Sequence, residues 1–270
     1  MVELAWGVYV YFWIRDAEAE PGAWLEAAAA HVDELSRVGQ AELRSLLALN
    51  RNSKGEFHRT EDDLVWSLDV FRDEGMSFMA AVTLKELGTV RYVVDEAPER
   101  AVAALEESSA LFESVEHDWG VALTETMLGT MLAVSGDLVG GEAHHLRSLE
   151  RSRAIDSDQL VVQALHQLGM VRVLEGRAHE AVELVAEAAT IVVREGFQVP
   201  ATACLDVLGA AAVRLGDVAV GVDALLTAAA VRRRLGAAPW PTIARFVDAM
   251  TAEAVARMDE PELLEQQQRA

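Results

Sequence analysis

Cysteine and lysine are almost absent from this chain. Its single cysteine, Cys204, cannot form a disulfide within the chain and nothing points to an oxidising compartment, so we expect a cytoplasmic protein. Lys54 and Lys85 are the only lysines, and arginine supplies nearly all of the positive charge. Long apolar runs are scarce as well. The apolar, aromatic stretch at residues 8–14 is short and follows an acidic start, so we expect neither a signal peptide nor a membrane span.

Positive charge is also scarce relative to negative charge, and the formal net charge is −21 at pH 7. Such a charge repels nucleic-acid phosphates and anionic lipid headgroups, so we expect no direct nucleic-acid partner and no membrane partner. The one dense basic run, Arg232 to Arg234, lies near the expected end of a helix. There its charge is better suited to the helix dipole and neighbouring glutamates than to a bound anion.

The motifs of common catalytic and metal sites are missing. The chain has no G-x-S-x-G elbow, no G-x-G-x-x-G turn and no H-E-x-x-H zinc motif. His144 and His145 are adjacent, so they point to different sides of a helix, and no further ligand completes a metal set. No basic residue in the same helical turn lowers the pKa of the Cys204 thiol, which favours a packing role. We predict a noncatalytic protein without a cofactor or metal site, with an enzyme of unrecognised type as an alternative.

What the chain has in abundance is a repeat with a period of about 40 residues. A leucine-glycine pair returns at Leu87-Gly88, Leu128-Gly129, Leu168-Gly169 and Leu208-Gly209. Another glycine follows three of these pairs, at Gly136, Gly176 and Gly216, where a helix that ends in the left-handed conformation favours it. Small residues recur further along each unit, at Ala101, Gly141, Ala181 and Gly221 and at Ser108, Ser148, Ala188 and Ala228. This spacing predicts closely packed, antiparallel helix pairs.

The repeat sets the predicted boundaries of a single helical domain over residues 1–258. We expect an all-α, right-handed superhelical solenoid of about six helix pairs, each packed mainly on its neighbours. The pairs cover approximately residues 1–38, 39–75, 76–117, 118–157, 158–197 and 198–237. Prolines at 239 and 241 end the repeats, and an amphipathic capping helix follows at 241–258. Its apolar face consists of Ile243, Phe246, Val247, Met250 and Met258, and a polar tail occupies 259–270.

The first predicted helix is unusually aromatic. Its aromatic side chains are distributed around the helix, which is not expected of a helix with one side in water. They are Trp6, Tyr9, Tyr11, Phe12 and Trp13. Two interpretations stay open. Either the chain is a fragment or descendant of a longer protein whose upstream residues cover this helix, or the helix forms a homodimer.

The placement of small residues and turn glycines resembles tetratricopeptide (TPR) repeats, with a period longer than the usual 34 residues. The stretches VYVYFWIRDAEAEPGAWLEAAAA and ALLTAAAVRRRLGAAPWPTIARFVDAM resemble the helical C-terminal region of bacterial ATPase-type transcriptional regulators, the AfsR-like and LuxR-type proteins related to the maltose-regulon activator. In that family an ATPase precedes the repeats, and the repeats sense an inducer or dock a partner protein. This chain has no G-x-x-x-x-G-K-[ST] phosphate loop and no evident DNA-reading helix pair, so the resemblance implies only the sensor or docking part.

In TPR-like arrays the first helix of each pair faces the concave side. Helical periodicity then assigns a mixed set of side chains to this face. The predicted binding residues are Lys85, Tyr92, Thr126, Gln163, His166, Met170, Asp206 and Arg214. An apolar floor with separated donors and acceptors suits a peptide or partner protein, and a small-molecule inducer enclosed by the superhelix is the alternative. Ordinary packing roles for His166 and Met170 stay open beside these.

Arginines recur three residues after the first glycine, or its counterpart, in three repeats, at Arg51, Arg91 and Arg172. The favoured interpretation is structural: the stems pack while the heads pair with acidic residues of the next helix. The alternative is an arginine ladder that binds carboxylates or phosphates.

Overall fold

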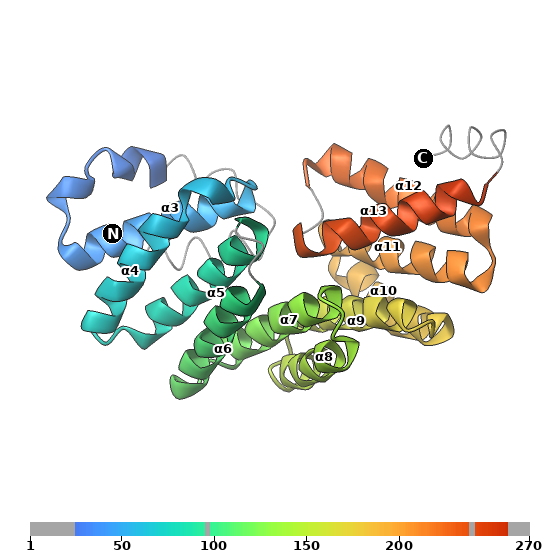
Figure 1. The fold of residues 1–270 in the computed structure, drawn as a ribbon, viewed down its shortest axis with the longest axis horizontal. Helices are drawn as coiled ribbons and strands as arrows, with labels where there is room; N and C mark the ends of the chain where they lie inside the picture. Colours follow the sequence, from blue (N-terminus) through green and yellow to red (C-terminus); the bar gives the residue numbers. More distant parts are fainter. Residues whose placement is uncertain (1–24, 95–97, 238–240, 259–270) are drawn as a thin grey trace. The chain divides into compact units, whose positions relative to one another are not determined.

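The structure is a computed structural model, and it describes residues 25–94, 98–237 and 241–258 (Figure 1). Helices and the short turns between them make up these ranges. No strand occurs in these ranges, and the predicted all-α, TPR-like solenoid fold is confirmed. The aromatic helix predicted around residues 6–13 and the polar tail lie outside the described residues. None of the described helices combines the length and apolarity needed to cross a membrane.

Five helix pairs and one terminal helix follow one another in the described ranges. The pairs are α3 (Arg37–Ser53) with α4 (Glu61–Asp73), α5 (Ser77–Val94) with α6 (Pro98–Ser114), α7 (Asp118–Val134) with α8 (Leu138–Ala154), α9 (Asp158–Leu174) with α10 (Ala178–Glu195), and α11 (Gln198–Leu215) with α12 (Val218–Leu235). The terminal helix is α13 (Pro241–Ala256), and two short 3-10 helices, η1 (Val32–Glu34) and η2 (Phe57–Arg59), flank α3. We call α3, α5, α7, α9 and α11 the first helices, and their partners the second helices.

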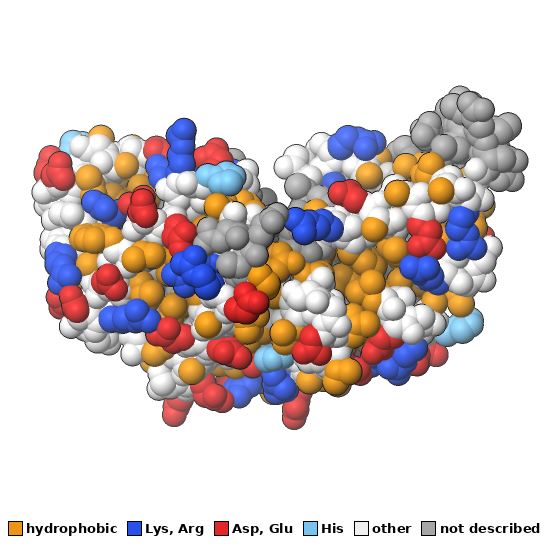
Figure 2. Space-filling model, viewed as in Figure 1, with side chains coloured by type: hydrophobic (Ala, Val, Ile, Leu, Met, Phe, Trp, Pro, Cys, Tyr) orange, Lys and Arg blue, Asp and Glu red, His pale blue; other side chains and the backbone are white. Residues whose placement is uncertain are grey.

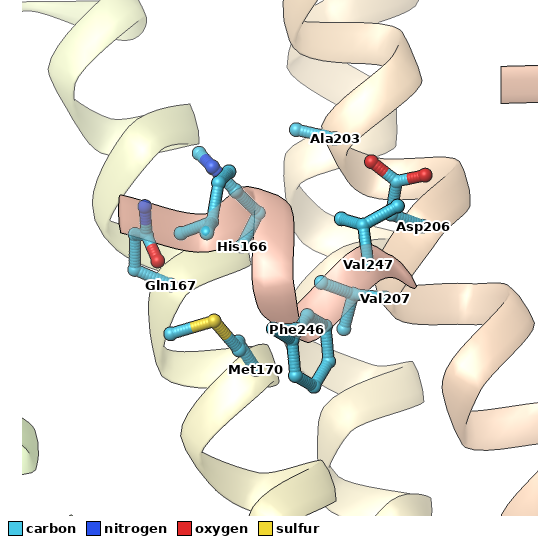
Figure 3. A pocket seen from close by; sticks show the side chains of 9 residues that line it. His166, Gln167, Met170, Ala203, Asp206, Val207, Phe246 and Val247 are labelled. Carbon is cyan, nitrogen blue, oxygen red and sulfur yellow. The ribbon is translucent and has the colours of Figure 1, made fainter. Parts of the chain in front are cut away.

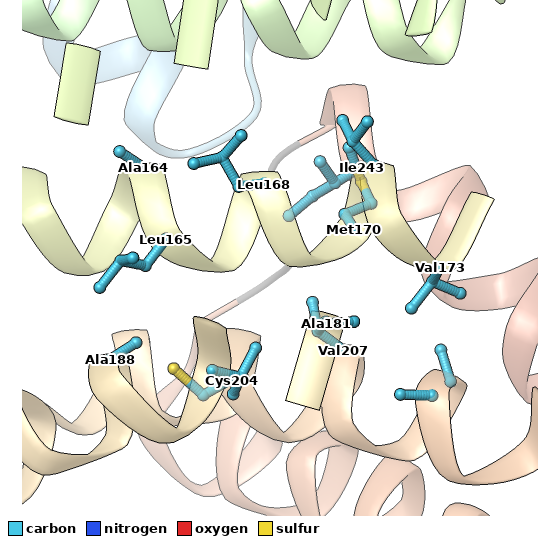
Figure 4. Packing of buried hydrophobic residues seen from close by; sticks show 14 of the residues in the cluster. Ala164, Leu165, Leu168, Met170, Val173, Ala181, Ala188, Cys204, Val207 and Ile243 are labelled. Carbon is cyan, nitrogen blue, oxygen red and sulfur yellow. The ribbon is translucent and has the colours of Figure 1, made fainter. Parts of the chain in front are cut away.

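The chain divides into two compact units, each with its own buried residues. The first unit ends at Thr124 and the second begins at Glu125, so the division falls inside α7. In the first unit, α3 to α6 pack around side chains such as Leu46, Phe71 and Leu87, which are fully buried. In the second unit, α9, α10 and α11 enclose an equivalent aliphatic cluster (Figure 4).

Close contact between helices explains why the leucine-glycine pair recurs. A Cβ atom on Gly129 would lie 2.7 Å from two ring atoms of His145 and 2.9 Å from the carbonyl oxygen of Gly141, both on α8. A Cβ atom on Gly209 would lie 2.7 Å from Cγ of Leu225 on α12. Distances this short leave no room for a side chain, so glycine allows the two helices of a pair to touch through their backbones.

The side chain opposite each of these glycines occupies the same place in its repeat, which we call the packing slot. The four slot residues, spaced by 40 in the sequence, are Leu105, His145, Val185 and Leu225. All four are buried, and His145 is the polar member. Neither of its ring nitrogens has a hydrogen-bond partner among the described residues. Burial lowers the pKa of His145 to about 3, so the ring is neutral at pH 7.

A glycine-aspartate turn begins two of the second helices. Gly136 and Gly216 have φ values of +100° and +96°, which residues other than glycine rarely adopt. The following residues, Asp137 and Asp217, cap α8 and α12 by accepting hydrogen bonds from backbone N–H groups at 2.9 and 3.4 Å. Each turn therefore ends one helix and starts the next within two or three residues.

The terminal helix α13 belongs to the second unit and packs on its first helices. Ile243, Phe246, Val247 and Met250 are buried in the same cluster as α9 and α11 (Figure 4). Their i, i+3, i+4 and i+7 spacing places them on one face of α13. This arrangement makes α13 part of the surface on which the predicted binding residues lie.

Candidate functional site

All eight predicted binding residues lie on first helices. Two are on α5 in the first unit, and the other six are on α7, α9 and α11 in the second unit. The binding role of each stays a prediction, because a position on a first helix does not by itself give access to a ligand. Burial and hydrogen bonding separate the accessible side chains from those that hold the fold together.

Lys85 is at one end of a buried polar chain in the first unit. Its ammonium group contacts the carboxylate of Glu86, which also accepts a hydrogen bond from Asn52 Nδ2 at 3.0 Å. Asn52 Oδ1 in turn accepts a hydrogen bond from the Thr60 hydroxyl at 2.9 Å. The charge of Lys85 is thus engaged in linking α5 to α3. Tyr92, two turns further along α5, is partly exposed.

Thr126 and Gln163 differ in their access to solvent. Thr126 is buried, and its hydroxyl oxygen lies 2.6 Å from that of Ser148 on α8, so it joins the two helices of its pair. Gln163 is partly exposed on α9. Of the two, Gln163 is placed to meet a ligand from solvent.

Three of the predicted residues meet at one small cavity in the second unit. His166 and Met170 of α9 and Asp206 of α11 line a space of about 10 Å³ that α13 closes (Figure 3). The other lining residues are Gln167, Ala203, Val207, Ile243, Phe246 and Val247. A space of this size is close to the minimum for a single water molecule. No organic ligand fits there while α13 is in place.

Two polar side chains of α9 give this cavity its hydrogen-bonding character. His166 Nδ1 lies 3.0 Å from the carbonyl oxygen of Val162 and must donate to it, because a carbonyl oxygen only accepts. Burial lowers the pKa of His166, so the ring is neutral and its Nε2 is an acceptor. Gln167 is 5% exposed, and its Oε1 atom has no hydrogen-bond partner in the described part of the chain. The cavity therefore presents acceptors that a donor from a ligand would satisfy.

Asp206 is engaged in a buried ion pair between α11 and α12. Arg232 Nη1 and Nη2 donate to its two carboxylate oxygens at 2.6 and 3.0 Å, and both side chains are buried. Removal from water raises the pKa of the Asp206 carboxyl, and the Arg232 guanidinium opposes that shift. Its carboxylate therefore joins the helices of the last pair, while its outer edge borders the cavity. The sequence pattern placed Arg232 at a helix end and did not anticipate this pair.

Arg214 is partly exposed, and its guanidinium group contacts α13. Its Nη1 donates to the Glu253 carboxylate at 2.9 Å, and its Nη2 lies 3.9 Å from the sulfur of Met250. In the other direction, Arg257 Nη1, just beyond α13, donates to the carbonyl oxygen of Val213 at 2.8 Å. A helix of the chain itself thus occupies the place that the sequence pattern assigned to a ligand.

The other candidates for chemistry make structural contacts. Glu125 lies 2.9 Å from both His144 Nδ1 and Arg147 Nε; burial opposes its ionisation, but these two partners outweigh burial and lower the pKa of Glu125. Burial raises the pKa of the Cys204 thiol to about 12, which leaves almost no reactive thiolate at pH 7. Within the ranges that the structure describes, no three His, Cys, Asp or Glu side chains are grouped to hold a metal ion.

The three repeated arginines are all paired with acidic side chains. Arg51 pairs with the next helix along the chain, as the structural interpretation predicted, whereas Arg91 pairs with the preceding helix through Glu61, and Arg172 pairs with both neighbouring helices through Glu142 and Glu180. The pairs are Arg51–Asp63 at 3.9 Å, Arg91–Glu61 at 3.2 Å and Arg172–Glu175 at 2.8 Å. Arg172 is 8% exposed, and its bond to Glu142 is the largest cause of its raised pKa. Figure 2 shows the same mixing of basic and acidic side chains on the face in view. These arginines are consequently engaged within the protein.

This architecture defines a TPR-like helical repeat protein. No protein-family model matches the chain, and no curated protein sequence matches it. Among solved structures, the chain is similar to a Rap protein complexed with competence and sporulation factor, at 14% identity and a TM-score of 0.66 over 95% of this chain and 74% of that one. It is similar to the apo form of RapI at 10% identity and a TM-score of 0.64, over 100% and 99% of the two chains.

A third similar structure is a signal transduction ATPase with numerous domains and a tetratricopeptide repeat sensor, from Pyrococcus horikoshii. The identity is 12% and the TM-score is 0.65, over 99% of this chain and 43% of that chain. Identities this low establish the fold alone, so any conclusion on function rests on the site.

The sequence pattern did not identify α13 as part of the site, and it also missed three cavity-lining residues, Gln167, Ala203 and Val207. Gln167 and Val207 went unnamed because they lie two residues before the glycine of their repeats, outside the offsets assigned to the concave face, whereas Ala203 lies at an assigned offset but was not chosen. An apolar stripe such as that of α13 shows that a helix is packed, but it does not say on which neighbour. One signal was available: Gln167 is a polar residue directly before the Leu168-Gly169 pair.

Proposed function

We propose that this chain is a noncatalytic TPR-like binding domain that holds a peptide or a partner protein on the face formed by its first helices. In this proposal it is the sensor or docking part of a bacterial transcriptional or signalling regulator and works in the cytoplasm. The observation that carries the proposal is the group of His166, Gln167 and Met170 on α9, where an apolar floor meets the unpartnered Gln167 Oε1 acceptor; a peptide reaches this group when α13 moves aside. Such a mixed surface suits the alternating amide groups and side chains of a peptide.

Two further observations support a binding role. The fold is shared with a Rap protein solved together with competence and sporulation factor, and with an ATPase that carries a TPR sensor. The side chains that catalysis would need, such as Cys204 and the buried histidines, are neutral and engaged in packing or backbone hydrogen bonds. Dimerisation through the aromatic helix around residues 6–13 is a separate prediction that sedimentation at micromolar concentration tests.

Selection of peptides tests the proposal directly. Linear peptides would be selected from a displayed library on the immobilised full chain, and their affinities measured by calorimetry for the wild type and for Tyr92→Ala and Gln163→Ala. We expect at least one of these first-helix variants to bind about tenfold more weakly, while Val193→Ala, at an 82% exposed position on the second helix α10, binds as the wild type does. A loss confined to Val193→Ala, or no selected peptide, would contradict the proposal.

A small-molecule inducer is the second candidate, and the unpartnered Gln167 Oε1 atom beside the cavity favours it; α13 would have to move aside, because a space of about 10 Å³ holds no organic ligand. A ligand that binds only the folded state raises the melting temperature, because it stabilises that state by RT ln(1 + [L]/Kd). A panel of metabolites rich in hydrogen-bond donors would be screened by thermal shift. A concentration-dependent rise that Gln167→Leu removes supports the receptor, and its absence across the panel leaves peptide binding as the favoured function.

A further inference from the structure

α13 covers the very part of the second unit in which three predicted binding residues meet. Its apolar side chains close the cavity lined by His166, Met170 and Asp206 (Figure 3). These side chains follow the i, i+3, i+4 and i+7 spacing by which an amphipathic helix lies in a hydrophobic groove. The first helices of this unit therefore already hold a helix, which shows what kind of segment their surface accepts.

The fit between α13 and this surface is incomplete. A space of about 10 Å³ is left between α13, α9 and α11, and the Gln167 Oε1 atom beside it is buried without a partner among the described residues. A buried acceptor without a donor has a higher free energy than the same acceptor hydrated by water or hydrogen-bonded within the protein. A segment that offers Gln167 a donor would satisfy what α13 leaves unsatisfied.

The ion pair that joins α13 to α11 is at the surface. The Arg214–Glu253 pair is formed by side chains that are 39% and 31% exposed, and exposed pairs of this kind contribute little to holding a helix in place. The attachment of α13 rests mainly on its buried apolar face, Ile243, Phe246, Val247 and Met250, and on Ala254, which packs with Val213, Val222 and Leu225. By contrast, a buried ion pair, Asp206–Arg232, attaches α12 to α11. A segment that replaces α13 must therefore present a comparable apolar face.

We propose that α13 is a displaceable occupant of this surface, and that the partner which displaces it is another amphipathic helix. This partner helix has apolar residues at the spacing of Ile243, Phe246, Val247 and Met250 and a carboxylate for Arg214. The inference rests on the proposed function and specifies its partner and its regulation: α13 keeps the site closed until a better-fitting helix competes for it.

A synthetic peptide of residues 241–258, labelled with fluorescein, tests the competition. Its binding would be followed by anisotropy with the full chain and with full-chain Phe246→Asp, whose own α13 no longer docks. We expect the variant to bind the peptide at least about tenfold more tightly than the wild type, since a competing intramolecular helix reduces apparent affinity. The control chain Ala249→Asp, changed at an exposed position of α13, should bind as the wild type does. A peptide that itself carries Phe246→Asp should bind none of the chains.

Two results would overturn the inference: equal peptide affinity for the wild type and a folded Phe246→Asp chain, or no binding to either. Hydrogen exchange of the unchanged protein gives a second measurement that does not depend on any variant. We expect the amides of α13 to exchange at least about a hundredfold faster than those of α9 and α11, because α13 opens without global unfolding. Exchange of α13 as slow as that of α11 would exclude a displaceable helix.

Failure of this inference is distinguishable from failure of the proposed function. Selected peptides could lose affinity on Gln163→Ala yet bind the wild type and Phe246→Asp equally well. Such a result keeps the proposed binding face and removes the role of α13. If no selected peptide binds any of these chains, the proposed function itself fails.

Discussion

His145 occupies a packing slot that Leu105, Val185 and Leu225 fill in the neighbouring repeats. Its ring is buried against Gly129, and its nitrogens have no hydrogen-bond partner within the described ranges. Desolvation is the largest cause of its depressed pKa, and the neighbouring His166 and His144 lower it further. A histidine in an apolar slot therefore makes stability depend on pH, because the unfolded chain binds a proton that the folded chain does not.

Replacement of this histidine by the residue of the equivalent slots tests that conclusion. The pKa of His145 is about 3 in the folded chain against an ordinary 6.5, so its stabilising contribution is complete above pH 6.5 and is lost as the pH falls towards 3. His145→Leu should remove about 1.4 kcal/mol of the loss in unfolding free energy between pH 7.5 and pH 5.5. Urea titration at the two pH values measures this difference.

The same substitution should raise stability at pH 7.5 by about 1 kcal/mol, since it removes two unsatisfied buried nitrogens. The exposed His31 provides a control, and His31→Gln should keep the wild-type dependence on pH. An unchanged pH dependence in His145→Leu would mean that the ring is hydrated in the folded protein.

Alanine substitution at the repeated glycines separates tight from looser helix contacts. Gly129→Ala places its Cβ 2.7 Å from the His145 ring and 2.9 Å from a backbone oxygen, whereas the nearest atoms to Gly169→Ala are side-chain methyl groups of Val207 and Val185 at 3.0 and 3.1 Å. We expect Gly129→Ala to destabilise the protein by about 1–3 kcal/mol. Gly169→Ala should cost clearly less, because methyl groups can shift and alanine favours the helix by about 1 kcal/mol. Equal urea midpoints for the two variants would contradict close backbone contact at Gly129.

At the scale of single elements, helix starts differ in whether a side chain caps them. Asp137 accepts a hydrogen bond from the Gly140 N–H at 2.9 Å at the start of α8, while Ser157, at the start of α9, makes no side-chain cap. Asp137→Ala should lower the unfolding free energy by about 1 kcal/mol, and Ser157→Ala should change it by less than half as much. Thermal and urea unfolding of both variants measure the contrast. A larger loss of stability in Ser157→Ala than in Asp137→Ala would show that the Asp137 hydrogen bond is not what stabilises the start of α8.

The elements show how far sequence reasoning reaches. Helix pairs were predictable because Leu128-Gly129 and its equivalents repeat at a fixed step, and a repeated step can only come from a repeated packing contact. The Asp206–Arg232 pair was not predictable, because a single contact between two residues on different helices produces no repeating pattern in the sequence. The same holds for α13: its spacing revealed an apolar face, but whether that face continues the stack or folds onto α9 and α11 depends on the shape of the surface that receives it. The predicted binding residues were therefore placed on first helices without knowledge of what covers them.

For the whole molecule, charge is the dominant long-range effect. The net charge of −21 gives a repulsion that opposes the compact state, while exposed ion pairs such as Arg37–Asp73 contribute little. Salt screens the repulsion over about 10 Å at 0.1 M. We expect the melting temperature at pH 7 to rise by several degrees between 20 mM and 500 mM sodium chloride. Sucrose at equal osmolality is the control: it is excluded from the protein surface but does not screen charge, so it separates the two effects. A melting temperature that falls with salt would show that attractive ion pairs outweigh the repulsion from the net charge.

The packing slots have a practical consequence for protein engineering. Because four slots at a constant step can be compared within one sequence, the chain supplies its own consensus, and an idealised repeat can be written from it without any other protein. Whole copies of such a unit, inserted between α8 and α9, would lengthen the array while leaving α9, α11 and α13 together, so the number of repeats becomes a design variable independent of the cavity that these three helices line.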